Sequence, residues 1–131
     1  MREILFKGFF PCETGNTTIY VGGKDVKGDW VYGDYHQKGK YIYETDGSVR
    51  YEVIPETVCQ STELQDIKHK DIFEHDVCKW KDSDGAEHYF EVRYKHGCYI
   101  TSNGDVLYSV LALNVEVVGN IRDKEIKTTA V

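Results

Sequence analysis

Short segments of alternating apolar and polar residues, separated by glycine-containing turns, run through most of this 131-residue chain. Alternation with period two is typical of strands that bury one face, whereas a helix repeats about every 3.6 residues. The pattern predicts strands over residues 2–7, 17–21, 29–37, 40–44, 49–54, 76–81, 88–95, 98–102 and 115–121. Helical spacing occurs over 106–111, where a strand stays an equal alternative, and 61–65 offers a one-turn helix. We therefore expect a mainly β fold, a small barrel-like or two-sheet architecture of short antiparallel strands with at most one or two short helices.

Turn signals divide this pattern. Asp46-Gly47 predicts a hairpin, because this dipeptide accepts the positive φ angles of a type I′ turn, and Gly22-Gly23 and Lys27-Gly28 punctuate the chain before its third strand. After Pro55 the alternating pattern gives way to a polar segment, within what we expect to be a single domain. We expect an N-terminal sheet over 1–54, an SH3-like barrel half over 55–121 and a charged tail over 122–131.

The charge and composition narrow the class of protein. Sixteen basic residues against 22 acidic ones give a net charge of −6, which does not suit a strongly basic nucleic-acid binder. Ten tyrosines, five phenylalanines and two tryptophans are too many for a disordered chain. Since no apolar run approaches the length of a secretory signal or a membrane helix, we expect a soluble, cytoplasmic protein.

Cysteines and histidines raise the question of a metal site. No Cys-x-x-Cys pair is present, and in a reducing cytosol we expect four free thiols, several of them buried: Cys12, Cys59, Cys78 and Cys98. His75 with Cys78, and His96 with Cys98, have the ligand types of a zinc site. Buried thiols and turn histidines explain these pairs better, so we expect no metal and no cofactor.

Carboxylate pairs invite a hydrolase interpretation, and they are Asp29 with Asp34, Glu74 with Asp76, and Asp82 with Asp84. Each pair lies in or beside a turn, where aspartate is favoured for its hydrogen bonds to the backbone. No nucleophile elbow, phosphate-binding loop or His-Glu-x-x-His motif is present. We expect no catalytic residues and no enzymatic activity.

Four ordered blocks span the chain from end to end, and together they resemble the YopX family of phages and prophages. They are Met1–Gly8, Gly28-Asp29-Trp30-Val31-Tyr32-Gly33-Asp34, Ile54–Gln60 continuing through Leu64, Asp66 and Lys70 to Asp71-Ile72-Phe73-Glu74 and Asp76-Val77, and Val117-Val118-Gly119-Asn120-Ile121. The resemblance implies a phage-encoded accessory protein of mainly β structure with no established activity. It transfers no functional residue.

The chain departs from that family pattern in one apparent insertion and in several turns. Residues 9–25 look like an insertion between the first two blocks, of unknown role. Glu63 and His75 stand where the family usually has glycine, and His69-Lys70 stands near its Asn-Gly. We therefore expect those turns to be built differently or to be less tight.

Two sets of side chains are candidates for an interaction surface. The tyrosines are more numerous than a small β core can hide, and tyrosine suits protein interfaces, so Tyr32, Tyr35, Tyr41 and Tyr43 point to self-association or to a host or phage protein partner. In the 29–37 strand, Trp30, Tyr32 and Asp34 should share one face and Val31, Gly33 and Tyr35 the other.

The second set is basic: Lys79, Lys81, Arg93 and Lys95, interleaved with Trp80, Phe90 and Tyr94. Basic residues beside aromatics are typical of surfaces that grip single-stranded nucleic acid. Because Glu91 shares a strand face with Arg93 and the chain is acidic, nucleic-acid binding is the alternative and a protein partner the primary expectation. In the block 71–80 we expect Ile72, Phe73, Val77 and Trp80 to be buried, so we expect the role of this block to be structural.

Overall fold

A computed structural model describes residues 5–36, 39–44 and 48–124 of the chain. Within them, two compact units are present: residues 5–61 with 122–124, and residues 62–121. No helix in this part of the chain is long and apolar enough to cross a membrane. The predicted Asp46-Gly47 turn and the ends of three predicted segments, at 2–4, 37 and 125–131, lie outside the described residues.

The first unit is built from antiparallel strands. They pair in the order β5-β4-β3-β1-β6, and β2 pairs with the first part of β3. The strands are β1 (Phe6–Pro11), β2 (Thr17–Val21), β3 (Lys24–His36), β4 (Tyr41–Tyr43), β5 (Arg50–Glu52) and β6 (Ile54–Gln65), the last of which continues into the second unit.

The apparent insertion over residues 9–25 forms part of this sheet. It contains the end of β1, all of β2 and the Gly22-Gly23 turn, in which both glycines have positive φ (61° and 80°). Its Phe9, Ile19 and Val21 are the buried centre of the first unit's core, and Val26, Trp30 and Ile54 pack against them. The segment 9–25 therefore contributes to the hydrophobic core of the first unit.

Strand β3 is longer than the alternation predicts, and the expected break at Lys27-Gly28 is wrong. Gly28 lies in mid-strand, paired with Pro11 on one side and Thr17 on the other. A Cβ atom there would stand 2.2 Å from the carbonyl oxygen of Phe10, so only glycine permits the strands to approach so closely.

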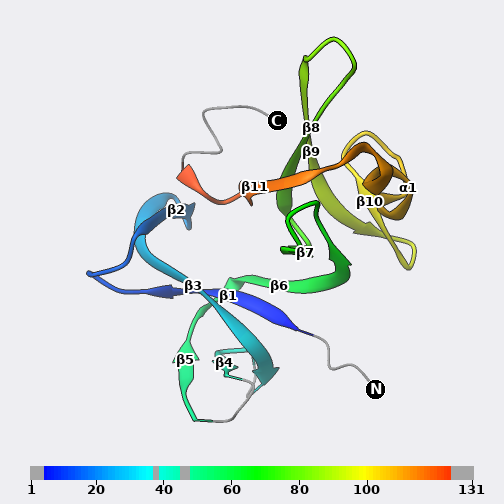
Figure 1. The fold of residues 1–131 in the computed structure, drawn as a ribbon. Helices are drawn as coiled ribbons and strands as arrows, with labels where there is room; N and C mark the ends of the chain where they lie inside the picture. The colour runs from blue at the N-terminus through cyan, green and yellow to red at the C-terminus, as the bar shows by residue number, and fades with distance from the viewer. Residues whose placement is uncertain (1–4, 37–38, 45–47, 125–131) are drawn as a thin grey trace. The chain divides into compact units, whose positions relative to one another are not determined.

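In the second unit, β6 pairs with β7 (Asp71–Phe73), and a separate sheet has the order β10-β9-β8-β11. Its members are β8 (Asp76–Lys81), β9 (Glu87–Lys95), β10 (Cys98–Thr101) and β11 (Glu116–Asn120). In Figure 1, β8 and β9 form a long hairpin, and the helical segment lies next to β10. That segment is α1 (Leu107–Val110) followed by the 3-10 turn η1 (Leu111–Leu113), so the helical alternative for 106–111 is confirmed.

The prediction of a mainly β fold is confirmed in its two-sheet form, and among the described residues neither set of strands closes into a barrel. The expected one-turn helix at 61–65 is wrong, because β6 continues through these residues. Thr62 there donates a hydrogen bond to the carbonyl of Ile72 at 2.8 Å.

The units divide between Ser61 and Thr62, later than the Pro55 boundary expected from sequence. Proline is tolerated near the start of a strand, and Pro55 is the second residue of β6. The first residues of the expected tail also return to the first unit: the backbone of Tyr20 donates to the Arg122 carbonyl at 2.9 Å, and the Trp30 indole donates to Asp123 at 3.0 Å.

The core of the second unit gathers apolar side chains from both sheet and helix. Its buried members are Ile72, Cys78, Phe90, Val92, Leu107, Val115 and Val117. The predicted burial of Ile72, Phe73 and Val77 is confirmed, and Trp80 is half-buried against this cluster. Burial of each such side chain stabilises the unit by about 1.5–3 kcal/mol.

The turns that depart from the family pattern keep a backbone suited to glycine. Glu63, His69 and His75 have φ of 64°, 63° and 69°, in the left-handed region that most side chains avoid. This chain adopts the glycine conformation with residues that have a Cβ atom.

Candidate functional site

A tyrosine-rich surface lies on β3, β4 and β5 of the first unit. The register pairs Asp34 with Tyr43, and Tyr41 lies two positions before Tyr43 on β4, so these three positions face the same side of the sheet. Tyr32 precedes Asp34 by two positions on β3 and shares that side, as the alternation predicts. Tyr32 is 45% exposed, whereas Tyr41 and Tyr43 are half-buried.

Arg50, on β5, completes this surface. It pairs with Tyr43 in the register, and its guanidinium carbon lies 4.5 Å from the centre of the Tyr41 ring. A hydrogen bond with Tyr43, together with the nearby Tyr41 hydroxyl, raises the pKa of Arg50 above its usual value, so the cation is retained. The Tyr41 and Tyr43 ring centres are 6.4 Å apart. We call Tyr32, Tyr41, Tyr43 and Arg50 the tyrosine face.

Tyr35 is not part of the tyrosine face. It pairs with Ile42, which is buried, and its ring lies 5.4 Å from that of Phe6 on the other side of the sheet. Phe10 and Tyr51 make a similar contact at 5.2 Å. Of the four predicted tyrosines, Tyr32, Tyr41 and Tyr43 thus lie on one side of the sheet, and the Tyr41 and Tyr43 rings are neighbours.

The four predicted basic residues share one face of the sheet in the second unit. Lys79 pairs with Tyr89, Lys81 pairs with Glu87, and the alternation of β9 adds Arg93 and Lys95. Three carboxylates lie among them on the same face, those of Glu87, Glu91 and Glu116.

These carboxylates neutralise much of the positive charge. Lys79 lies 3.4 Å from Glu87 and 4.0 Å from Glu116, and Arg93 lies 3.2 Å from Glu91. The hydrogen bond from Tyr89, with the nearby Lys79, lowers the pKa of Glu87, so this carboxylate stays ionised at neutral pH. We call this surface the mixed-charge face.

The aromatic residues interleaved with these cations in sequence lie on the opposite face. Cys78 pairs with Phe90 and Trp80 with His88, on the side that carries the core. Phe90 is buried, and Tyr94 packs its ring 5.0 Å from that of Tyr99. These residues therefore do not form a surface that combines basic and aromatic side chains, as proteins that bind single-stranded nucleic acid do.

Two of the three acidic pairs bind turn amides, as the turn argument predicts for every pair. Asp29 and Asp34 lie instead within β3, where Asp29 accepts a hydrogen bond from the Asn16 amide at 3.0 Å. Asp76 accepts a hydrogen bond from the amide of Phe73 at 2.8 Å, and Asp82 accepts from the amides of Asp84 (2.9 Å) and Ala86 (3.0 Å). Across the described part of the chain, no three His, Cys, Asp or Glu side chains are grouped so that they could hold a metal ion. All four cysteines are free thiols, and burial is confirmed for Cys59 and Cys78.

Sequence reasoning missed a buried carboxylate of the second unit that binds three backbone amides. Asp66 is buried, and it accepts hydrogen bonds from the amides of Lys68 (2.9 Å), Lys70 (2.8 Å) and Val117 (2.9 Å). It therefore ties the turn after β6 to β11. An aspartate at the start of the mostly polar segment 66–71 indicates the local turn, but the contact with Val117, 51 residues away, has no local signal.

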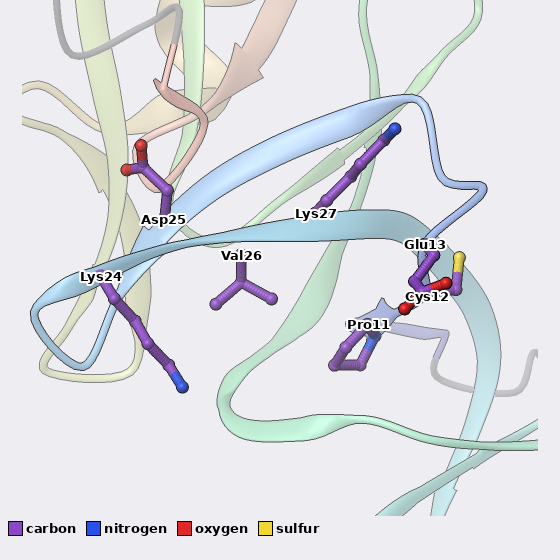
Figure 2. Close-up of a pocket in the computed structure, with 7 residues that line it drawn as sticks. All are labelled: Pro11, Cys12, Glu13, Lys24, Asp25, Val26 and Lys27. Carbon is purple, nitrogen blue, oxygen red and sulfur yellow. The ribbon is translucent and has the colours of Figure 1, made fainter.

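A groove of about 530 Å³ lies in the first unit beside the start of β3. Figure 2 shows that Lys24 and Val26 point to one side of the strand, and Asp25 and Lys27 to the other. Pro11, Cys12 and Glu13 form the remaining wall, and Asp25 is bound to Lys124 at 2.6 Å. Because charges of both signs alternate along this open edge, the groove has no convergent set of polar groups for a small ligand.

Comparison with known proteins gives one match. A family model described as YopX protein matches residues 15–124, which includes the first unit from the loop before β2 onward and all of the second. No curated protein and no solved structure matches the chain. The match covers most of the sequence, and this chain belongs to the YopX family.

Proposed function

We propose that this chain is an accessory protein of a phage or prophage that acts in the host cytoplasm by binding protein, either a partner or a second copy of itself, through the tyrosine face. It does so without catalysis. The observation that carries the proposal is the grouping of Tyr32, Tyr41, Tyr43 and Arg50 on one side of β3–β5.

Tyrosine and arginine are the residue types most enriched at protein interfaces and at their energetic centres. A tyrosine ring offers apolar area and a hydroxyl with little conformational entropy to lose. Arg50 is already ordered over Tyr41, so a partner that stacks on it would bind to a pre-organised group.

A photo-crosslinking amino acid in place of Tyr32 tests this function in the full chain. Tyr20 is a matched control, since it is 41% exposed against 45% for Tyr32 and pairs with Asp25, on the other side of the sheet from the tyrosine face. We expect a discrete protein adduct, or a cross-linked dimer, from position 32 and not from position 20. Equal adducts from both positions would contradict the proposal.

Binding of single-stranded nucleic acid is the second candidate, and the shared face of Lys79, Lys81, Arg93 and Lys95 favours it. The carboxylates of the mixed-charge face and the net charge of −6 oppose it. Retention on immobilised single-stranded DNA at low salt tests this candidate. Retention that is lost with modest salt and with Arg93→Glu would support it, because such binding depends on released counterions.

A further inference from the structure

A pocket at an open strand edge of the second unit does not belong to the tyrosine face. Its volume is about 330 Å³, at the lower end of the roughly 300–1,000 Å³ of ligand sites. The residues that line it are Ile67, Lys79, Trp80, Lys81, Leu113, Asn114 and Glu116. We call it the β8 edge pocket.

The strand register explains why an edge is open here. β9 accompanies β8 as far as Lys81, whereas β11 pairs with β8 only as far as Lys79, opposite Glu116. Before Glu116, the chain enters β11 from η1 through Asn114, whose φ of 60° is left-handed. On the β11 side of Lys81, no strand pairs with β8 in the described parts of the chain.

The backbone of Lys81 points toward this open side. The amide of Asp82 donates to the Ala86 carbonyl at 3.0 Å, so residue 82 directs its hydrogen-bonding groups toward the β9 arm of the hairpin. Successive residues of an antiparallel strand alternate in this respect. The N–H and C=O of Lys81 are thus directed away from β9, as are those of Lys79, which β11 covers.

The side chains around this edge are apolar at two positions and positively charged at the strand end. Ile67 is 53% exposed and Leu113 is 41% exposed, and Trp80 lies beside them, stacked on His88 with ring centres 4.4 Å apart. Exposed apolar side chains rimmed by charges mark protein interaction sites.

The charged side chains around the β8 edge pocket indicate the charge of a partner that would bind there. The carboxylate of Glu116 is held by Lys68 at 2.5 Å, and that bond lowers the pKa of Glu116. Lys79 is shared between Glu116 and Glu87. Lys81 has no ion pair within 4.0 Å among the residues that the structure describes. Its charge acts on Glu87, its cross-strand partner, only over a longer distance, so its ammonium group can contact a partner carboxylate directly.

From these features we infer that the β8 edge pocket binds an extended acidic peptide segment of a partner protein by strand addition. The peptide pairs its backbone with Lys81, inserts an apolar side chain between Ile67 and Leu113 against Trp80, and places a carboxylate on the Lys81 ammonium group. Strand addition obtains affinity from backbone hydrogen bonds and specificity from alternate side chains, which suits a segment that alternates acidic and apolar residues. This site is independent of the tyrosine face.

Titration of the isotope-labelled full chain, followed by two-dimensional NMR, tests the inference. The probe is acetyl-Asp-Leu-Glu-Ile-Asp-Val-amide, and the charge-reversed control is acetyl-Lys-Leu-Lys-Ile-Lys-Val-amide. We expect the acidic peptide to shift the amides of Ile67, Lys81 and Leu113 and the indole signal of Trp80. We also expect slower exchange of the Lys81 amide proton with solvent, which attraction between charges alone would not produce.

Substitutions at exposed positions give matched comparisons. Lys81→Glu should weaken binding of the acidic peptide at least about tenfold, since it replaces an attraction with a repulsion. Lys95→Glu makes the same charge change on the same face of the sheet but outside the pocket, and should alter affinity less than about twofold. Leu113→Ala should weaken binding about three- to tenfold through lost apolar contact.

Several results would overturn the inference. They are the absence of shifts at about 1 mM acidic peptide, equal binding of the basic peptide, or equal losses from Lys81→Glu and Lys95→Glu. A concentration-dependent dimer that Lys81→Glu abolishes, without any peptide binding, would assign the pocket to a second copy of the chain instead. None of these outcomes bears on cross-linking from position 32, so the two proposals fail separately.

Discussion

Replacement of His69 with glycine should stabilise the second unit, although it removes a side chain. His69 has a φ of 63°, and its side chain forms no hydrogen bond or ion pair with any described residue. A left-handed backbone costs a residue with a Cβ atom about 1–2 kcal/mol. Glycine avoids that cost but loses about 0.5–1 kcal/mol more backbone entropy on folding. The net gain in unfolding free energy should be about 0.5–1 kcal/mol.

Urea unfolding followed by the indole NMR signal of Trp80 measures this effect, because Trp80 packs against the core of the second unit. With a denaturant slope of about 2 kcal/mol/M, the midpoint of His69→Gly should rise by about 0.3–0.5 M. The amide of His69 keeps its hydrogen bond to the Asp66 carbonyl, 3.0 Å in the structure, because glycine retains that group.

Two controls separate backbone strain from other effects. Lys70→Gly changes the neighbouring exposed residue, whose φ is not positive, and should lower stability by about 0.5–1 kcal/mol. His69→Ala removes the imidazole but keeps the Cβ atom, and should give no gain. If His69→Gly lowers the midpoint as much as Lys70→Gly does, the strain argument is refuted.

Three further predictions concern single side chains. Asp66→Ala should lower the unfolding free energy by about 3 kcal/mol in the same urea assay, because it leaves buried amides without an acceptor; loss below about 1 kcal/mol would contradict this. Asp123→Ala should cost about 1 kcal/mol and shift the indole NMR signal of Trp30, and an unmoved signal would show that their contact does not form in solution. The hydrogen bond with His88 lowers the pKa of Asp82 below 3.8, so its stabilising contribution is complete above about pH 3.8 and is lost as the pH falls through the lower folded-state pKa. His88→Ala should therefore raise the pKa of Asp82 in an NMR titration, and an unchanged value would rule out this cause.

The strands that the sequence predicts most closely are those whose alternation is undisturbed. The 17–21 and 76–81 segments match β2 and β8 in both bounds. β3 was underestimated because Gly28 has the composition of a turn but serves a close contact between strands, which depends on β1 and cannot be seen locally.

The candidate surfaces show the same division between local and distant information. Alternation along one strand correctly separates Tyr32 from Tyr35, and the register of β3 with β4 brings Tyr41 and Tyr43 to the side of Tyr32. The neutralisation of Lys79 and Arg93 depends on carboxylates from β9 and β11, so the four basic residues considered by themselves overstate the net positive charge of the folded surface.

The left-handed backbone at Glu63, His69 and His75 depends on contacts that the local sequence does not show. A residue with a Cβ atom at a glycine position predicts a changed turn, because the substitution carries a cost. In this fold, the surrounding hydrogen bonds hold the turn, as in the bond from the His75 amide to the Val92 carbonyl at 2.8 Å. Tertiary contacts therefore preserve a backbone conformation that the local sequence disfavours.

Cross-linking from position 32 tests the central claim, that this YopX family member binds protein through its tyrosine face. The measurement is the yield of discrete protein adducts from the photo-reactive residue at Tyr32, relative to Tyr20, with and without Arg50→Glu. We expect a high ratio that falls severalfold with Arg50→Glu, because that change removes the cation over Tyr41. A ratio near one, or one that Arg50→Glu leaves unchanged, would contradict the claim.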